Sequence, residues 1–118
     1  MQTETKTEDL ELTHLELYRG SEQYHGVMGV NATDGVAYIM ENGYSWFVTD
    51  MVVILRMKLQ HEEFCAVKLK LLQDNKAEAV ITDGNDKVLY RQKYDYTNAR
   101  KELTLFYTNN VLMLSGEY

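Results

Sequence analysis

The pattern of hydrophobic and polar positions divides the chain into two parts. Between residues 33 and 57 the apolar side chains recur with the period of a helix, and this stretch holds the densest apolar run and the only tryptophan, Trp46. After residue 61 the period changes to two, which indicates β-strands. The pattern therefore predicts helices followed by a sheet.

Two helices are predicted in the first apolar stretch. Thr33 or Asp34 is a suitable N-cap, because a short oxygen-bearing side chain accepts hydrogen bonds from the free N–H groups of the next turn. The Asn-Gly pair at residues 42–43 is a stop signal, and Ser45 can cap a second helix over residues 46–57. That helix is apolar around more than half of its circumference, so it needs cover on several sides.

Five strands are predicted in the second part, at residues 62–72, 77–82, 87–96, 102–108 and 111–115. Polar turns separate the first three, which predicts an antiparallel meander. The last two flank an Asn-Asn pair; because asparagine tolerates positive φ, this pair predicts a two-residue hairpin loop with Tyr107 opposite Leu112. The hairpin has two apolar faces, which need cover by the helices and a long loop or by a second subunit.

The first 32 residues have a weaker pattern. Residues 1–8 are polar and acidic, and we expect a flexible tail there. Residues 9–19 favour a helix over two short strands. Residues 23–30 are expected to form a short irregular or helical segment, because Gly26 and Gly29 weaken a helix.

These elements predict an α+β fold: N-terminal helices packed on an antiparallel sheet of about five strands that ends in a C-terminal hairpin. The chain has 118 residues and no proline, so it offers no rigid linker. We expect one domain over residues 9–118, preceded by the tail.

The net charge of −6 is distributed unevenly along the chain. Residues 1–22 hold six acids and two bases, a sum of −4, whereas residues 23–118 hold twelve acids and ten bases, a sum of −2. Proteins that bind duplex nucleic acid use Lys and Arg to release counterions from phosphates. We therefore expect no duplex nucleic acid among the partners.

The sequence predicts a soluble cytoplasmic protein. Cys65 is the only cysteine, which excludes an intramolecular disulfide and fits a reducing compartment. The first ten residues lack the basic and apolar regions of a secretory signal. The longest apolar run is shorter than the roughly 20 residues that span a bilayer, so no membrane partner is expected.

Six short segments carry a family resemblance: RGSEQYH (19–25), TDGVAYI (33–39), WFVTD (46–50), DGN (83–85), YTN (96–98) and NNVLMLSGEY (109–118). They resemble a family of small uncharacterised bacterial proteins that are often carried on phages and other mobile elements. The chain departs from this family at Asn98 and Gly116 and by its missing proline. The resemblance implies a bacterial or phage context and a self-contained cytoplasmic protein, but it assigns no catalytic residue.

The candidate metal ligands lack the spacing of a metal site. His14, His25 and His61 are far apart in sequence, and none is paired at the short intervals that zinc ligands use. Cys65 falls on the apolar side of a predicted strand, where a thiol is inert. We expect no metal and no cofactor.

Asp50 is the most unusual polar residue in the predicted helices. A carboxylate buried in an apolar helix needs a partner, and Arg56, Tyr24 or His25 are the candidates. A structural anchor is favoured over an acid–base role. The alternative is a small enzyme in which Asp50 acts together with Tyr24 and His25.

Tyrosines supply the main candidate binding surface. Tyr90, Tyr94 and Tyr96 share one predicted strand face, with Arg91 and Lys93 on the other. Aromatic and basic side chains together can stack and bind single-stranded nucleic acid, but tyrosine is also enriched at protein interfaces, and the net charge favours a protein.

The acidic N-terminal arm is the second candidate binding surface. Its carboxylates lie near helical spacing and can mimic a phosphate backbone; they are Glu4, Glu8, Glu11 and Glu16. Most runs of this kind are solvated faces.

The sequence thus predicts a non-catalytic protein-binding factor with a protein partner and a possible homodimer. The resemblance extends this hypothesis to a phage or mobile-element inhibitor of a host defence protein, as in counter-defence or anti-CRISPR activity. The alternatives are the enzyme around Asp50 and a single-stranded nucleic-acid binder that uses the three tyrosines.

Overall fold

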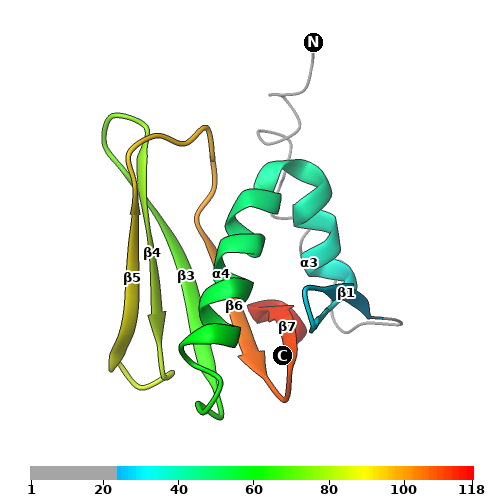
Figure 1. The fold of residues 1–118 in the computed structure, drawn as a ribbon. Coiled ribbons are helices and arrows are strands. Elements are labelled where there is room, and N and C mark those ends of the chain that lie inside the picture. Colours follow the sequence, from blue (N-terminus) through cyan, green and yellow to red (C-terminus); the bar gives the residue numbers. More distant parts are fainter. Residues whose placement is uncertain (1–23) are drawn as a thin grey trace.

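A computed structural model describes residues 24–118 and has the α+β fold that the sequence predicts (Figure 1). A helical stretch of 24 residues is built from α3 (Asp34–Ile39), a wider turn (Met40–Tyr44) and α4 (Ser45–Met57). A mixed, mostly antiparallel sheet of seven strands forms the rest of the fold, followed by a short 3-10 turn (Ser115–Glu117).

The helical stretch bends at the predicted Asn-Gly stop. Asn42 and Gly43 leave helical backbone angles, and Gly43 has a φ of 102°, a left-handed value that favours glycine. The predicted interruption is confirmed. The predicted cap at Ser45 is wrong, because Ser45 is already the first residue of α4 and Tyr44 occupies the capping position without a side-chain hydrogen bond.

The seven strands lie in the order β1-β2-β7-β6-β3-β4-β5, and all neighbours are antiparallel except β2 and β7. Their bounds are β1 (His25–Val27), β2 (Val30–Ala32), β3 (Cys65–Leu72), β4 (Lys76–Thr82), β5 (Val88–Tyr94), β6 (Leu103–Thr108) and β7 (Val111–Leu114). The five strands predicted from residue 62 onward are all present, as β3 to β7. The meander β3-β4-β5 is confirmed.

The C-terminal hairpin has the predicted register. Tyr107 pairs with Leu112, and the two loop residues have positive φ values, 52° for Asn109 and 62° for Asn110. Both values are in the region that asparagine tolerates, and for this reason the Asn-Asn pair predicted the two-residue loop correctly.

The prediction of about five strands was too low, because residues 25–32 form the hairpin β1-β2 rather than an irregular or helical segment. Met28 and Gly29 make the turn with positive φ values of 52° and 92°. β2 then pairs in parallel with β7, through Asn31 opposite Val111. A partner 80 residues away leaves no local sequence signal, which explains the error. The predicted tail at residues 1–8 and helix at residues 9–19 lie outside the described residues.

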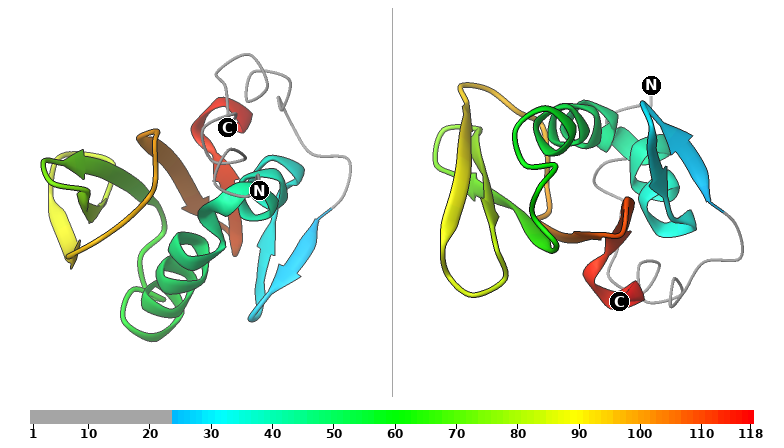
Figure 2. Two further views of the ribbon diagram at one scale, coloured as in Figure 1. Left: turned by 90° about the horizontal axis from the view of Figure 1, so that it is seen from above. Right: turned by 60° about the horizontal axis from the view of Figure 1, so that its bottom comes forward.

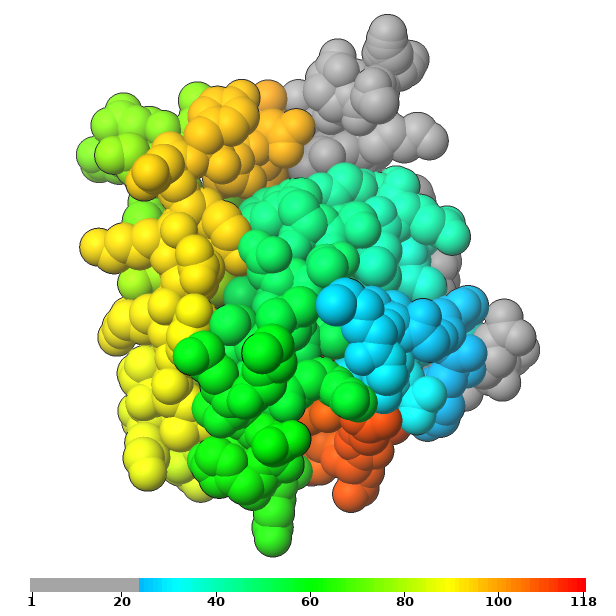
Figure 3. All heavy atoms as spheres, in the orientation of Figure 1, coloured from blue at the N-terminus to red at the C-terminus, as the bar shows by residue number. Residues whose placement is uncertain are grey.

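The sheet is strongly curved and encloses α4 on its inner face (Figures 1 and 2). The core is made of helix side chains such as Phe47, Met51 and Leu55 and inward strand residues such as Val67 and Leu105, all of which are fully buried. In the view of Figure 3, α4 remains visible between β5 and the hairpin β1-β2. No helix within residues 24–118 is long and apolar enough to cross a membrane.

Candidate binding surface

The carboxylate of Asp50 has a different partner from those predicted. It accepts a hydrogen bond from the Tyr94 hydroxyl at 2.9 Å, and the Tyr94 ring meets Trp46 edge-on at a centroid distance of 4.9 Å. Asp50 is exposed rather than buried. The expectation of a buried carboxylate was wrong, because even a largely apolar helix has a solvent-exposed side. Asp50 lies on that side, beside the edge strand β5.

The three residues considered as partners of Asp50 lie elsewhere. His25 Nε2 lies 2.8 Å from Asp34 Oδ1, and Arg56 Nη1 donates to the carbonyl of Gly29 at 3.2 Å. The Tyr24 side chain is exposed. Within the described residues, no hydrogen bond brings any of them to Asp50, so the predicted constellation is not assembled.

The three tyrosines predicted as a binding surface are not in one row. Tyr90 and Tyr94 are half-buried and pack against the core, on the helix side of the sheet. Burial raises the pKa of Tyr94, and the Asp50 carboxylate beside its hydroxyl raises it further. β5 ends at Tyr94, so Tyr96 lies beyond the strand, where its side chain is 73% exposed.

The other candidate groups have separate locations. Glu4, Glu8, Glu11, Glu16 and His14 lie outside the described residues. His61 stands 3.4 Å from Glu62 at the surface. Within residues 24–118 no group of three or more His, Cys, Asp or Glu side chains is arranged to hold a metal ion. Cys65 is buried. The loss of solvent around the thiol is the main cause that raises its pKa to about 11, and the nearby carboxylates of Glu62 and Asp83 are the smaller cause.

The Thr-Asp-Gly segment at the start of α3 is bound by the Glu117 carboxylate. This carboxylate accepts hydrogen bonds from the Thr33 hydroxyl at 2.6 Å, the Gly35 N–H at 3.1 Å and the Leu114 N–H at 2.8 Å. Thr33 also accepts from the Val36 N–H at 3.4 Å. A carboxylate at a helix N-terminus is stabilised by the free N–H groups and the helix dipole. The first turn of α3 thus holds the C-terminal 3-10 turn in place.

A side chain at Gly35 would force this contact to shift. A Cβ at Gly35 would lie 2.6 Å from Leu114 Cδ1 and 2.7 Å from Glu117 Oε1, closer than real Cβ atoms approach. The glycine therefore lets α3 and the C-terminal turn approach each other closely.

Three aromatic rings meet on the outer face of the sheet, and we call them the aromatic cluster: Phe64, Phe106 and Tyr118. The ring centroids of Phe64 and Phe106 are 5.2 Å apart, those of Phe64 and Tyr118 5.7 Å, and those of Phe106 and Tyr118 5.3 Å. The Tyr118 side chain is 73% exposed. The cluster is therefore a packed aromatic surface that still faces solvent.

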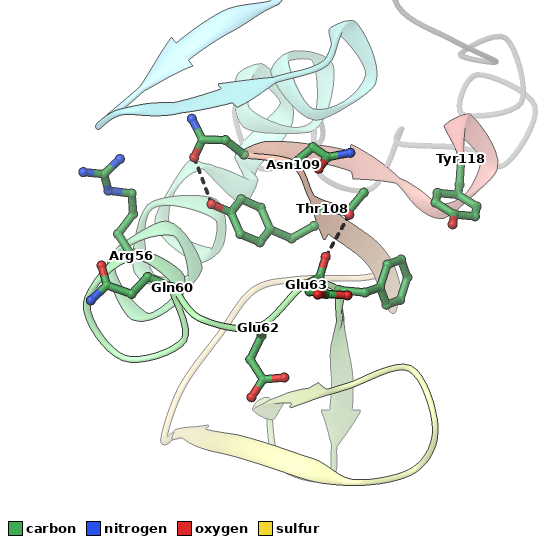
Figure 4. A pocket seen from close by; sticks show the side chains of 10 residues that line it. Arg56, Gln60, Glu62, Glu63, Thr108, Asn109 and Tyr118 are labelled. Carbon is green, nitrogen blue, oxygen red and sulfur yellow. Dashed lines mark hydrogen bonds between the residues drawn. The ribbon is translucent and has the colours of Figure 1, made fainter.

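Two open hollows adjoin the aromatic cluster. One has a volume of about 790 Å³ and a mainly polar lining between the end of α4, residues 60–64 and the β6-β7 loop. Figure 4 shows Arg56 and Gln60 on one side of it and Tyr118 on the other. The second hollow, of about 570 Å³, lies on the outer sheet face and is lined by the aromatic cluster, Lys68, Asp86 and several hydroxyl side chains.

Several side chains that line the polar hollow connect parts of the fold by hydrogen bonds. The Tyr107 hydroxyl donates to the Asn110 side chain at 2.9 Å, and Asn110 Nδ2 donates to the Gly29 carbonyl at 2.9 Å (Figure 4 shows the first of these). Arg56 donates to the same carbonyl. These contacts fix the turn of β1-β2 against the end of α4 and the β6-β7 loop.

The aromatic cluster was not predicted as a site. Its one sequence signal was the second apolar face of the C-terminal hairpin, which predicted that Phe106 needs cover. Part of that cover is Tyr118, which folds back over Phe106, and part is Phe64, the residue immediately before β3. Neither contact has a local pattern.

The fold and this surface define a small single-sheet α+β domain with an exposed aromatic cluster. The chain belongs to the family of unknown function DUF6876, whose model matches residues 9–118. Neither the curated proteins nor the solved structures contain a match to this chain.

Proposed function

We propose that this chain is a non-catalytic protein-binding factor that contacts its partner through the aromatic cluster. The observation that carries the proposal is the packing of Phe64, Phe106 and Tyr118 into one solvent-facing surface. Aromatic side chains are enriched at protein interfaces, because they offer a large rigid contact area at little cost in conformational entropy.

The position of Tyr118 supports this proposal. The residue before it, Glu117, is bonded to three groups of the scaffold, and the Tyr118 N–H donates to the Ser115 carbonyl at 3.3 Å. The ring is therefore ordered before a partner arrives. A preorganised contact loses less entropy on binding than a mobile one.

The finer part of the proposal is that the partner is a host protein and that binding inhibits it. It rests on the resemblance of segments such as WFVTD (46–50) and TDGVAYI (33–39) to proteins carried on phages and mobile elements. A counter-defence protein, including an anti-CRISPR protein, can inhibit its target by occupying a surface of it, and a small domain with one rigid aromatic surface is suited to that task.

The test is a pull-down from a bacterial host lysate followed by mass spectrometry, with the full chain as bait. Tyr118→Ala and Phe106→Ala should lose the captured protein. Tyr96→Ala is the matched control, because Tyr96 is a tyrosine with the same 73% exposure outside the cluster. Equal thermal unfolding of Tyr118→Ala and Tyr96→Ala would show that the loss is not caused by unfolding.

Two results would contradict the proposal. One is capture of no protein above background by the unchanged chain. The other is equal capture by the Tyr118→Ala and Tyr96→Ala variants, which would remove the aromatic cluster from the interface.

A further inference from the structure

Basic side chains gather on the outer face of the meander, next to the aromatic cluster. In the strand register Lys68 lies beside Val80, which lies beside Arg91, and in the next row Lys70, Glu78 and Lys93 follow one another. Lys76 stands at the end of the same face, opposite Leu72. We call Lys68, Lys70, Lys76, Arg91 and Lys93 the basic patch.

The basic patch is unusual in an acidic chain. Two acids lie among its five bases. Glu78 forms an ion pair with Arg91 at 3.4 Å, and the Glu102 carboxylate accepts a hydrogen bond from the Leu71 N–H near the end of β3. Five of the ten bases in residues 24–118 thus belong to this patch, with Glu78 and Glu102 beside them and Asp86 in the hollow that Lys68 lines. Residues 24–118 together hold ten bases and twelve acids, a sum of −2, so half of the positive charge of this acidic region lies on one face.

The basic patch continues directly from the aromatic cluster. Phe64, Ala66, Lys68 and Lys70 follow one another at alternate positions, so they lie on the same side of the chain as it enters and runs along β3. The hollow of about 570 Å³ is lined both by the aromatic cluster and by Lys68. One occupant can therefore contact rings at one end and cations at the other.

We propose that the partner presents an acidic, extended protein segment with an apolar side chain at one end. This inference rests on the proposed function and specifies its partner. The apolar side chain enters the hollow at the aromatic cluster, and carboxylates four and six positions away pair with Lys68 and Lys70. Alternate residues of an extended segment are about 6.7 Å apart, the same as alternate residues of β3, so the spacing of the two charge rows matches.

The charges around the rings favour a protein segment over single-stranded nucleic acid. Glu63 adjoins the cluster in the polar hollow, and Asp86 lines the second hollow with it. A nucleic-acid strand carries a phosphate at every nucleotide, so bases stacked on these rings would bring phosphates beside carboxylates. An acidic peptide can keep its carboxylates on the basic patch and place only an apolar group at the cluster.

The test is an NMR titration of the full chain with the peptide Phe-Ser-Gly-Ser-Glu-Ser-Glu. Amide signals of β3 and β5 should shift on binding, and raising the salt concentration should weaken binding, because exposed ion pairs are screened. The double variant Lys68→Glu/Lys70→Glu should bind at least ten-fold more weakly. The control Lys58→Glu/Lys101→Glu carries the same charge change outside the basic patch and should change affinity less than two-fold.

Three outcomes would overturn the inference: no shift at millimolar peptide, equal binding by Lys68→Glu/Lys70→Glu and the unchanged chain, or tighter binding of a single-stranded oligothymidine than of the peptide. The lysate capture separates this inference from the proposed function. If capture needs Tyr118 and Phe106 but survives in Lys68→Glu/Lys70→Glu, the protein-binding function stands and the acidic segment is wrong. If capture is lost in both sets of variants while Lys58→Glu/Lys101→Glu retains it, both proposals are supported.

Discussion

The Glu117 carboxylate accepts a 2.6 Å hydrogen bond from the hydroxyl of Thr33, a residue 84 positions earlier in the chain. This contact joins the N-terminus of α3 to the last turn of the described chain. It gives Thr33 a second role beside its local one as the N-cap of α3. Four predictions follow from this joint and from the packing of the core.

Glu117→Ala should lower the free energy of unfolding by about 2 kcal/mol, because it leaves two N–H groups and a hydroxyl without their charged acceptor. Urea unfolding followed by circular dichroism measures the change. Glu41→Ala removes an exposed carboxylate from the helical bend and is the control, with an expected change of less than about 0.5 kcal/mol. Equal effects of the two substitutions would show that Glu117 does not hold the joint together.

Gly35→Ala should destabilise the fold by about 1–3 kcal/mol, the usual cost of overpacking. Alanine normally favours a helix over glycine by about 1 kcal/mol, so the expected sign is the reverse of the intrinsic preference. The reason is the close approach of Leu114 and Glu117 to the missing Cβ.

The control for Gly35→Ala is Gly116→Ala, where nothing lies within 4 Å of an added Cβ. It should leave the midpoint of thermal unfolding nearly unchanged. A Gly35→Ala protein that is more stable than the unchanged chain would rule out the tight contact between α3 and the C-terminal turn.

Tyr94→Phe should cost about 1 kcal/mol of stability, because it removes the hydrogen bond to Asp50 from a partly exposed site. It should also change the alkaline pH profile. Burial and Asp50 raise the pKa of Tyr94, so the folded chain keeps this proton where the unfolded chain loses it, above a pH of about 10. The contribution of Tyr94 to stability is complete below that pH and is lost as the pH rises through the folded pKa.

The measurement for Tyr94 is the free energy of unfolding against pH, together with ultraviolet absorption of the phenolates. The unchanged chain should lose stability above pH 10 more steeply than Tyr94→Phe, and Tyr96→Phe should follow the unchanged chain. Identical slopes for all three proteins would mean that Tyr94 titrates normally in the fold.

Cys65 should react with thiol reagents only when the chain unfolds. Burial raises its pKa to about 11, so little thiolate is present near neutral pH, and the side chain is shielded within the sheet. Because the folded pKa lies above the unfolded one, the stabilising contribution is present below pH 9 and is lost as the pH rises through 11. Labelling by a chromogenic disulfide reagent measures this reactivity.

Substitutions at Cys65 give a second measurement of the same burial. Cys65→Ser should destabilise the fold by about 1–3 kcal/mol through an enclosed hydroxyl, and more than Cys65→Ala does. Fast labelling of the folded chain at pH 7, or a serine variant as stable as the alanine one, would contradict the buried position.

Local rules predicted much of this fold from sequence. The Asn-Gly break, the cap at Thr33 or Asp34, which the structure places at Thr33, the meander and the register of the C-terminal hairpin each depend on residues within a few positions of one another. The same rules failed at residues 25–32, because β2 is held by a parallel partner, β7, from the other end of the described chain. They also failed at Asp50, whose exposure depends on where β5 passes the helix.

Almost nothing of the candidate binding surface could be predicted from the sequence. Tyr90 and Tyr94 were predicted as a binding surface from their number and alternation, but they lie on the face of the sheet that packs against the core, paired with the buried residues Ile81 and Ala77. Phe64, Phe106 and Tyr118 come from three separate segments and share no spacing. The pairing of β3 with β6 brings Phe64 and Phe106 together, and the hydrogen bonds of Glu117 fix the turn that carries Tyr118 to them.

The sequence by itself determined the period of each element, the turns between neighbouring strands, the uneven charge along the chain and the single thiol, because these are set by residue type and short-range backbone preference. The tertiary structure alone decided which strands became neighbours, which tyrosines were covered and where the aromatic cluster and the basic patch came together. Those outcomes depend on contacts between segments up to 84 residues apart, and such contacts leave no periodic trace in the chain.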